Sequence, residues 1–278
     1  MLRIIGWFLA LTVNGQGHDG LEATDRLVPP GWSGNPWGPA ATEARRSGQI
    51  PPIRVTPLMA QWDRWGRSVL KDGDIVFRRG DARILFGRFP FSRFVANCSG
   101  SLYSHTGIVA VETDGPVIYD ITKAGVRRQP FCVWILDNVG PIGVKRLKPS
   151  LRDKVPAILA FCRTNYANQA AFDFELGLDD SAYYCVEMTE KAYRSTGLTL
   201  SEPIRLGDME HAAEFPLCIF GIQAMSAWTL KEPLSLEHRV FFPGNDHHGI
   251  WSSPYLETVY PAPSTTTAAK PSGSAARR

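Results

Sequence analysis

The strongest constraint on the fold is a predicted β-hairpin. Two apolar runs, residues 105–111 and 117–122, flank the turn-forming sequence Thr113-Asp-Gly115, a pattern typical of paired antiparallel strands. His105 begins the first run and Asp120 lies late in the second. Antiparallel pairing therefore brings a base and a carboxylate together at one end of the hairpin.

The segment 180–194 is predicted to be a loop that becomes a helix, with Cys185 in its first turn. Asp180 and Ser181 are both suitable N-cap residues, because a side-chain oxygen can accept from the free N–H groups of a first turn. Gly197 can close the helix in the left-handed conformation. Since the positive end of a helix favours a thiolate over a thiol, this position suits a nucleophilic sulfur. The alternative is a core cysteine kept for packing.

The same helix pattern predicts two faces. Its polar side consists of Glu187, Glu190 and Arg194, and the remaining side, which includes Val186 and Met188, is predicted to be buried.

Other elements follow from local patterns along the chain. Helices are predicted near residues 40–46, 59–71, 150–166 and 208–228, and strands near 75–77 and 142–147. Pro156 is tolerated only near a helix start, so the third helix is expected to begin around Lys154. The Arg- and Phe-rich segment 82–100 is predicted to be irregular, as a lid or a loop beside a cleft.

The sequence predicts five regions. These are a possible signal peptide (1–15), a Pro/Gly/Trp-rich linker or strap (16–57), a catalytic domain (58–205), a C-terminal extension packed on it (206–261) and a disordered tail (262–278). The apolar run after Arg3 favours export to the periplasm or the outside of the cell. A cytoplasmic protein is the alternative if that signal is not real.

Composition excludes several kinds of function. The net charge of +3 is too small to indicate binding to nucleic acid or to a membrane surface. No internal apolar run reaches the roughly 20 residues of a membrane span, so the mature chain is predicted to have none. The five cysteines include no Cys-x-x-Cys pair, which argues against a structural zinc site and a redox motif. Adjacent His247 and His248 point in different directions, so neither a metal nor a cofactor is predicted.

Four motifs occur in a fixed order: Gly73-Asp-Ile-Val-Phe77, Ser104-His-Thr-Gly-Ile-Val109, Phe172-Asp173 and Tyr184-Cys-Val-Glu-Met188. Together they resemble the YiiX/YebB-like branch of the NlpC/P60 superfamily, which consists of permuted papain-like cysteine hydrolases. The resemblance covers about residues 70–195, and residues 252–260 extend it weakly. It implies an α+β fold in which a small antiparallel sheet packs on the helix that carries the catalytic cysteine.

Carried over by position, the resemblance makes Cys185 the nucleophile, His105 the base and Asp120 the third polar residue. Glu112 and Asp114 in the hairpin are the alternatives to Asp120. Two positions depart from the family pattern: Asp120 stands where Glu is usual, and Val186 follows the cysteine where Ser is common.

The resemblance implies a cysteine hydrolase that cleaves an amide bond in a peptide or peptidoglycan-like substrate through a thioester. Some permuted relatives act on lipid acyl groups, so a lipid-directed thiol acyltransferase or esterase is the second hypothesis, and the Phe-rich segment 85–94 would suit an acyl chain. A third hypothesis, from another class, is a papain-like binding module without turnover.

Overall fold

The structure is a computed structural model that describes residues 31–80, 91–216 and 235–260, with Leu27, Pro29, Ala82 and short pieces between 219 and 227. The predicted signal peptide, the predicted tail and most of the Phe-rich segment lie outside the described residues. The predicted helix at 208–228 is wrong in its first part, since residues 208–214 form turns and short 3-10 helices, whereas the residues described between 216 and 227 are helical.

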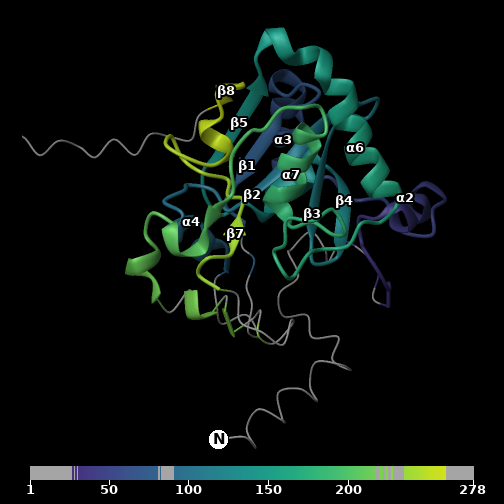
Figure 1. The fold of residues 1–278 in the computed structure, drawn as a ribbon. Helices are drawn as coiled ribbons and strands as arrows, with labels where there is room; N and C mark the ends of the chain where they lie inside the picture. Colours follow the sequence, from purple (N-terminus) through teal and green to yellow (C-terminus); the bar gives the residue numbers. More distant parts are fainter. Residues whose placement is uncertain are drawn as a thin grey trace, which may run out of the picture.

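A six-stranded antiparallel sheet forms the centre of the molecule (Figure 1). Its strand order is β4 (Gly125–Pro130), β3 (Gly115–Thr122), β2 (His105–Glu112), β1 (Ile75–Arg78), β5 (Ile142–Leu147) and β8 (Leu256–Tyr260). The predicted hairpin is confirmed, since β2 pairs with β3 and Glu112 lies opposite Gly115. The predicted strand at 142–147 is β5, whereas β4 was not predicted.

Helices cover both faces of the sheet, which confirms the α+β fold. On one face α6 (Val155–Ala167) and α7 (Cys185–Arg194) pack over Ile108 and Tyr119 (Figure 1). On the other face α3 (Pro57–Val69) and α5 (Phe131–Trp134) pack over Val109 and Ile118. These neighbouring strand residues face opposite ways because side chains alternate along a strand.

Local sequence explains where the principal helices begin. Thr56 caps α3 by accepting a hydrogen bond from the Met59 N–H at 3.2 Å, and Pro57 takes the first helical position. Helix α6 starts at Val155 with Pro156 in its first turn, close to the predicted start. The predicted helix at 40–46 is α2 (Pro39–Arg46).

One predicted irregular segment is in part helical. Residues 91–98 form α4 (Phe91–Cys98), so the prediction for that part is wrong. The described remainder contains the two-stranded sheet of β6 (Ile204–Arg205) and β7 (Arg239–Val240). It also contains short 3-10 helices: η2 (Ile135–Asp137), η3 (Pro149–Lys154), η4 (Leu206–Asp208), η5 (Ala212–Glu214) and η6 (Ile250–Ser252).

The segment before α3 lies along the edge strand β4. The Arg128 N–H donates to the Trp37 carbonyl at 3.1 Å, and the Asn35 amide donates to the Val126 carbonyl at 2.7 Å. Trp37 is itself buried. These contacts occupy backbone groups that an edge strand otherwise leaves free for another chain. Within the described residues, no helix has the length and apolar character needed to cross a bilayer.

Candidate active site

His105 and Asp120 meet at one end of the hairpin. His105 Nε2 lies 2.7 Å from Asp120 Oδ2, and both side chains are buried. The two alternative acidic residues, Glu112 and Asp114, lie at the turn end of the hairpin. Glu112 accepts from Arg128, and the backbone carbonyl of Asp114 accepts from Arg67. The hairpin therefore brings Asp120 to the imidazole and keeps its rivals at the other end.

Each residue of the Ser104–Gly107 motif has a separate structural task. Ser104 Oγ accepts from the Gly80 N–H at 3.0 Å, which ties the start of β2 to the end of β1. His105 contacts Asp120, and Thr106 faces α7. At Gly107 a Cβ atom would lie 2.4 Å from Ile118 Cγ2 and 3.3 Å from the Trp134 ring. Only glycine leaves room there for the Ile118 side chain, with the Trp134 ring also close.

Asp120 has two further partners that the sequence analysis missed, Arg127 and Trp134. Arg127 stands opposite Asp120 on β4 and donates from Nε to Oδ1 at 2.9 Å and from Nη2 to Oδ2 at 2.5 Å. The Trp134 indole N–H donates to Oδ2 at 2.7 Å. A sequence signal for Arg127 existed, because Gly125 after the second apolar run indicates another tight turn and a returning strand.

Trp134 is held from its other side by Arg78. The Arg78 guanidinium lies 4.2 Å from the centre of the Trp134 ring and donates to the Trp134 carbonyl at 2.6 Å. Asp137 lies 3.5 Å from the same guanidinium, and both groups are buried. Arg78 also stands opposite His105 in the sheet. This cluster therefore fixes the Trp134 ring beside the imidazole.

The surroundings set the charges of His105 and Asp120. Burial by itself lowers the pKa of His105, but hydrogen bonds to Asp120 and Cys185 and the charges of both groups outweigh burial and raise the pKa to about 9. Burial alone would raise the pKa of Asp120, yet the charge of Arg127 and the bonds from His105 and Arg127 hold that pKa far below its usual range. Both groups are therefore charged at neutral pH.

Cys185 is the first residue of α7, so the sulfur sits at the positive end of this helix. Its side chain is half-buried and lies near enough to His105 to help raise the pKa of the imidazole. The predicted cap is wrong: Tyr184, with extended backbone, precedes the helix, and Glu187 accepts from the Tyr184 N–H at 3.3 Å. Asp180 instead pairs with Lys191 at 2.7 Å. Cys132, Cys162 and Cys185 form no disulfide.

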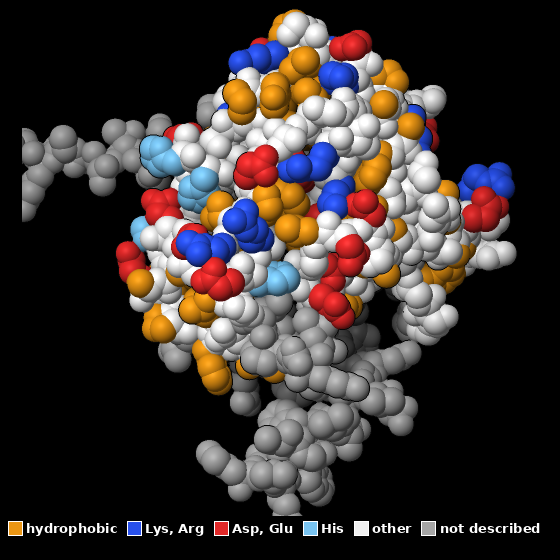
Figure 2. Space-filling model, viewed as in Figure 1, with side chains coloured by type: hydrophobic (Ala, Val, Ile, Leu, Met, Phe, Trp, Pro, Cys, Tyr) orange, Lys and Arg blue, Asp and Glu red, His pale blue; other side chains and the backbone are white. Residues whose placement is uncertain are grey.

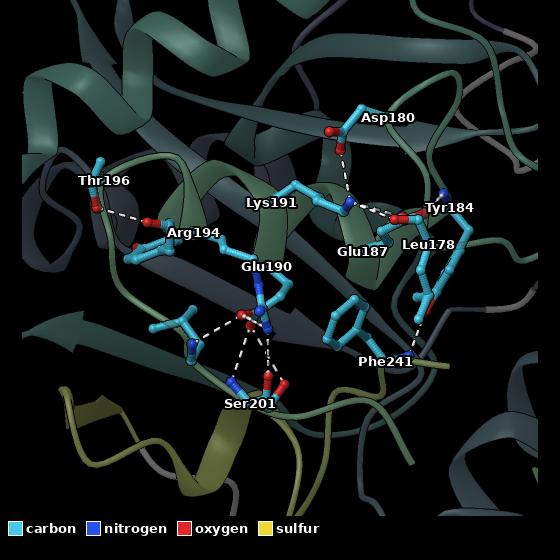
Figure 3. A network of polar contacts seen from close by, with 12 residues as sticks. Leu178, Asp180, Tyr184, Glu187, Glu190, Lys191, Arg194, Thr196, Ser201 and Phe241 are labelled. Atoms are coloured by element: carbon cyan, nitrogen blue, oxygen red, sulfur yellow. Dashed lines mark hydrogen bonds and ion pairs between the residues drawn. The ribbon is translucent and has the colours of Figure 1, made fainter. Parts of the chain in front are cut away.

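Two of the three residues on the predicted polar side of α7 are buried, and the third, Arg194, is partly exposed. Figure 3 shows Glu190 directed at Ser201 and Arg194, and Lys191 between Asp180 and Leu178. Glu187 and Glu190 are both fully buried. Burial raises the pKa of Glu187 to about 8 and that of Glu190 to about 7. The helix is thus anchored on both of its sides, which fixes the orientation of its first turn.

The other motifs have structural tasks. Asp74 accepts from Arg146 through both carboxylate oxygens at 2.7 Å, which joins β1 to β5. At Gly73 the backbone has φ +74, and a Cβ atom would lie 2.9 Å from Val155. Asp173 accepts from the Glu175 N–H at 2.7 Å and so holds its loop.

Comparison with known proteins finds relatives in one group. The chain is 25% identical to the protein from Escherichia coli K12 named "Uncharacterized protein YiiX" over 188 residues, which cover 67% of this chain and 84% of that protein. The crystal structure titled "metalloprotein yiiX" from Escherichia coli O157:H7 matches with a TM-score of 0.56 and 22% identity, over 69% of this chain and 98% of that one. The second match shows that the fold is shared.

The described part of this chain offers no group of three or more His, Cys, Asp or Glu side chains placed to hold a metal ion. His248 Nε2 lies 3.0 Å from the Ser99 carbonyl oxygen, and its Nδ1 lies 4.0 Å from Glu210. On the face drawn in Figure 2, basic and acidic side chains are interspersed rather than gathered by sign.

The family match covers the central sheet and does not include the segment before α3 that lies along β4. The family described as "Permuted papain-like amidase enzyme, YaeF/YiiX, C92 family" matches residues 69–259, from just before β1 into β8. This is more than half of the chain, and it includes Cys185, His105 and Asp120. Along this chain the strand that bears the histidine precedes the helix that bears the cysteine. The chain belongs to the family of permuted papain-like amidases that includes YaeF and YiiX.

Proposed function

We propose that the protein hydrolyses an amide bond in a peptide-like substrate, with Cys185 as nucleophile, His105 as general acid and base, and Asp120 as the residue that orients His105. One observation supports this most: His105 Nε2 lies 2.7 Å from the buried Asp120 carboxylate, and the nearby Cys185 side chain helps to raise the pKa of the same imidazole. A base held between a sulfur and a carboxylate is the arrangement that activates a thiol for attack.

The proposed reaction has two stages. The Cys185 sulfur attacks the amide carbonyl carbon, and the Cys185 backbone N–H at the helix start is suited to stabilising the oxyanion. Because Nε2 of His105 is bonded to Asp120, Nδ1 is the nitrogen available to protonate the leaving amine. The same nitrogen then takes a proton from water, whose oxygen attacks the thioester and releases the carboxylic acid and the thiolate.

Asp120 and its donors keep the imidazole in one orientation throughout. The carboxylate is fixed by Arg127 and Trp134, so it holds Nε2–H and leaves the opposite nitrogen toward the sulfur. The amide bond is preferred because the family is described as amidases. Export, which the N-terminal sequence favours, would expose the protein to cell-wall peptides.

Thiol reactivity tests the proposal. The full chain is treated with iodoacetamide near pH 7, and the adducts are mapped by mass spectrometry. We expect Cys185 to react fastest, and Cys185→Ala to lower turnover of peptide-amide substrates by about a thousandfold or more. Cys132→Ala is the matched control, since Cys132 is also free and half-buried. Burial raises the pKa of Cys132, so this thiol should react slowly.

Two results would count against the proposal. Equal labelling rates of Cys185 and Cys132 would show that the Cys185 thiol is not activated. Retained hydrolysis in Cys185→Ala would assign the chemistry to another group. Faster turnover of acyl esters than of amides by the unaltered protein would keep the nucleophile and change the substrate class.

A further inference from the structure

The two halves of the candidate site lie on different elements that are far apart in the sequence. His105 is carried by β2, and Cys185 is carried by α7 on one face of the sheet. The reaction proposed above needs the sulfur and the imidazole within hydrogen-bonding reach, and a displacement of about 1 Å can cost about a hundredfold in rate. A contact that fixes α7 against β2 therefore controls catalysis directly.

A pair of buried hydroxyl groups makes such a contact. Thr106 follows His105 in β2, and Thr189 lies one helical turn after Cys185 in α7. Their Oγ1 atoms are 2.9 Å apart, and Thr106 Oγ1 also donates toward the Cys185 carbonyl oxygen at 3.5 Å. Thr106 is 0% exposed and Thr189 is 2% exposed.

The alternation of side chains along β2 links the hydroxyl pair to the position of the base. His105 faces Asp120 and Trp134, while Thr106 faces the opposite way, toward the first turns of α7. One residue of the strand, His105, is thus the base, and the next residue, Thr106, contacts the helix that bears the sulfur. Since a hydroxyl carries a single proton, the donation from Thr106 to the Cys185 carbonyl makes Thr189 the donor to Thr106.

We propose that Thr106 and Thr189 are positioning residues for the nucleophile: their hydroxyl pair sets the distance and angle between the Cys185 sulfur and the His105 imidazole. This inference rests on the proposed function of the site. It predicts that the hydroxyl groups, and not merely the volume of the side chains, determine how reactive the sulfur is.

The test uses four variants of the full chain: Thr106→Val, Thr189→Val, the double variant and Thr106→Ser. The rate of Cys185 alkylation by iodoacetamide is measured from pH 5 to pH 10, together with kcat and KM on the amide substrate. We expect each valine variant to lower the alkylation rate and kcat by about tenfold, with little change in KM. Thr106→Ser should stay within about twofold of the unaltered protein, because serine keeps the hydroxyl.

Non-additivity is the sharper prediction. If the two hydroxyls act only through each other, the double variant should be no slower than either single one. Thr42→Val is the matched control. It removes a hydroxyl that is 2.7 Å from the Tyr166 hydroxyl, between α2 and α6, so it should lower the melting temperature without changing the alkylation profile.

Several outcomes would overturn the inference. These are an unchanged alkylation profile in Thr189→Val, a slow Thr106→Ser variant, or single effects that simply add. If Thr106→Val does not fold, Thr189→Val and Thr106→Ser carry the test. Slow labelling of Cys185 in the unaltered protein would instead refute the proposed function, so the two failures are distinguishable.

Discussion

Asp120, which bonds to His105, and Glu187, which lies in the first turn of α7, are both buried carboxylates. They differ in how many hydrogen bonds they accept. Asp120 accepts from Arg127, from the Trp134 indole and from His105. Glu187 accepts one backbone N–H, and its Oε1 atom is buried without a hydrogen-bond partner. Lys191 is 4.0 Å from Glu187 and is bonded more closely to Asp180.

The difference shows what keeps a buried acid ionised. Burial raises the pKa of both groups, but only Asp120 has enough donors to reverse that effect, so its pKa falls while that of Glu187 rises to about 8. Asp120 can therefore orient and charge His105 at neutral pH. Glu187 gains protonation as the pH falls and acts as a structural group in the first turn of α7.

Removal of the strongest donor should have the largest effect. Arg127→Met leaves the Asp120 carboxylate buried with fewer partners, and we expect a loss of about 3–5 kcal/mol in the free energy of unfolding, since breaking a buried pair strands a charge. Activity should fall as well, because the imidazole loses a fixed partner. Urea denaturation and turnover measurements check both effects.

Arg128→Met is the matched control for that variant. Arg128 is the next residue of β4 and pairs with Glu112, but both side chains are about a quarter exposed. A partly solvated pair contributes about 0–1 kcal/mol. Equal losses in the two variants would contradict the view that Asp120 depends on its donors.

A smaller effect is expected for the neutral donor. Trp134→Phe keeps an aromatic ring in place and removes only the N–H group that bonds to Asp120. We expect a loss of about 1.5–3 kcal/mol, the usual contribution of a hydrogen bond to a charged acceptor. Trp62→Phe makes the same change of ring in the aromatic cluster around Phe131 and should cost less. A larger loss in Trp62→Phe would point to packing instead of the hydrogen bond.

The smallest effect should have the opposite sign. Because the pKa of Glu187 is raised from 4.5 to about 8, the folded state binds this proton more tightly, and its contribution to stability is lost as pH rises between those values. Glu187→Gln should therefore be more stable than the unaltered protein at pH 9 and should show little gain at pH 4. The loss from deprotonation of His105 near pH 9 affects both proteins and cancels.

Chemical denaturation at the two pH values measures that gain. A variant that is equally destabilised at both would mean that the glutamate side chain is needed for a contact that glutamine cannot make. In that case Glu187 would resemble Asp120, and the contrast between the two carboxylates would disappear.

Local sequence was enough to predict the elements that carry the site. The turn at Thr113–Gly115 and the apolar runs around it gave the register that brings His105 to Asp120, and the family motifs pointed to Cys185 at a helix start. The predicted start of α7 was several residues too early, because the Asp180 side chain, which could cap a helix, pairs with Lys191 instead. Capping propensity cannot show which competing partner a side chain meets.

Sequence alone therefore determined the strand pair, the candidate base and the candidate sulfur, since turns and side-chain periodicity depend on neighbours along the chain. Only the tertiary structure decided that Arg127 and Trp134 converge on Asp120. It also decided that Glu187 and Glu190 are buried, although they belong to the predicted polar side of their helix. Burial depends on which distant segments cover a surface. Residues 198–201 and Phe241 do so for α7, and nothing in the helix itself specifies them.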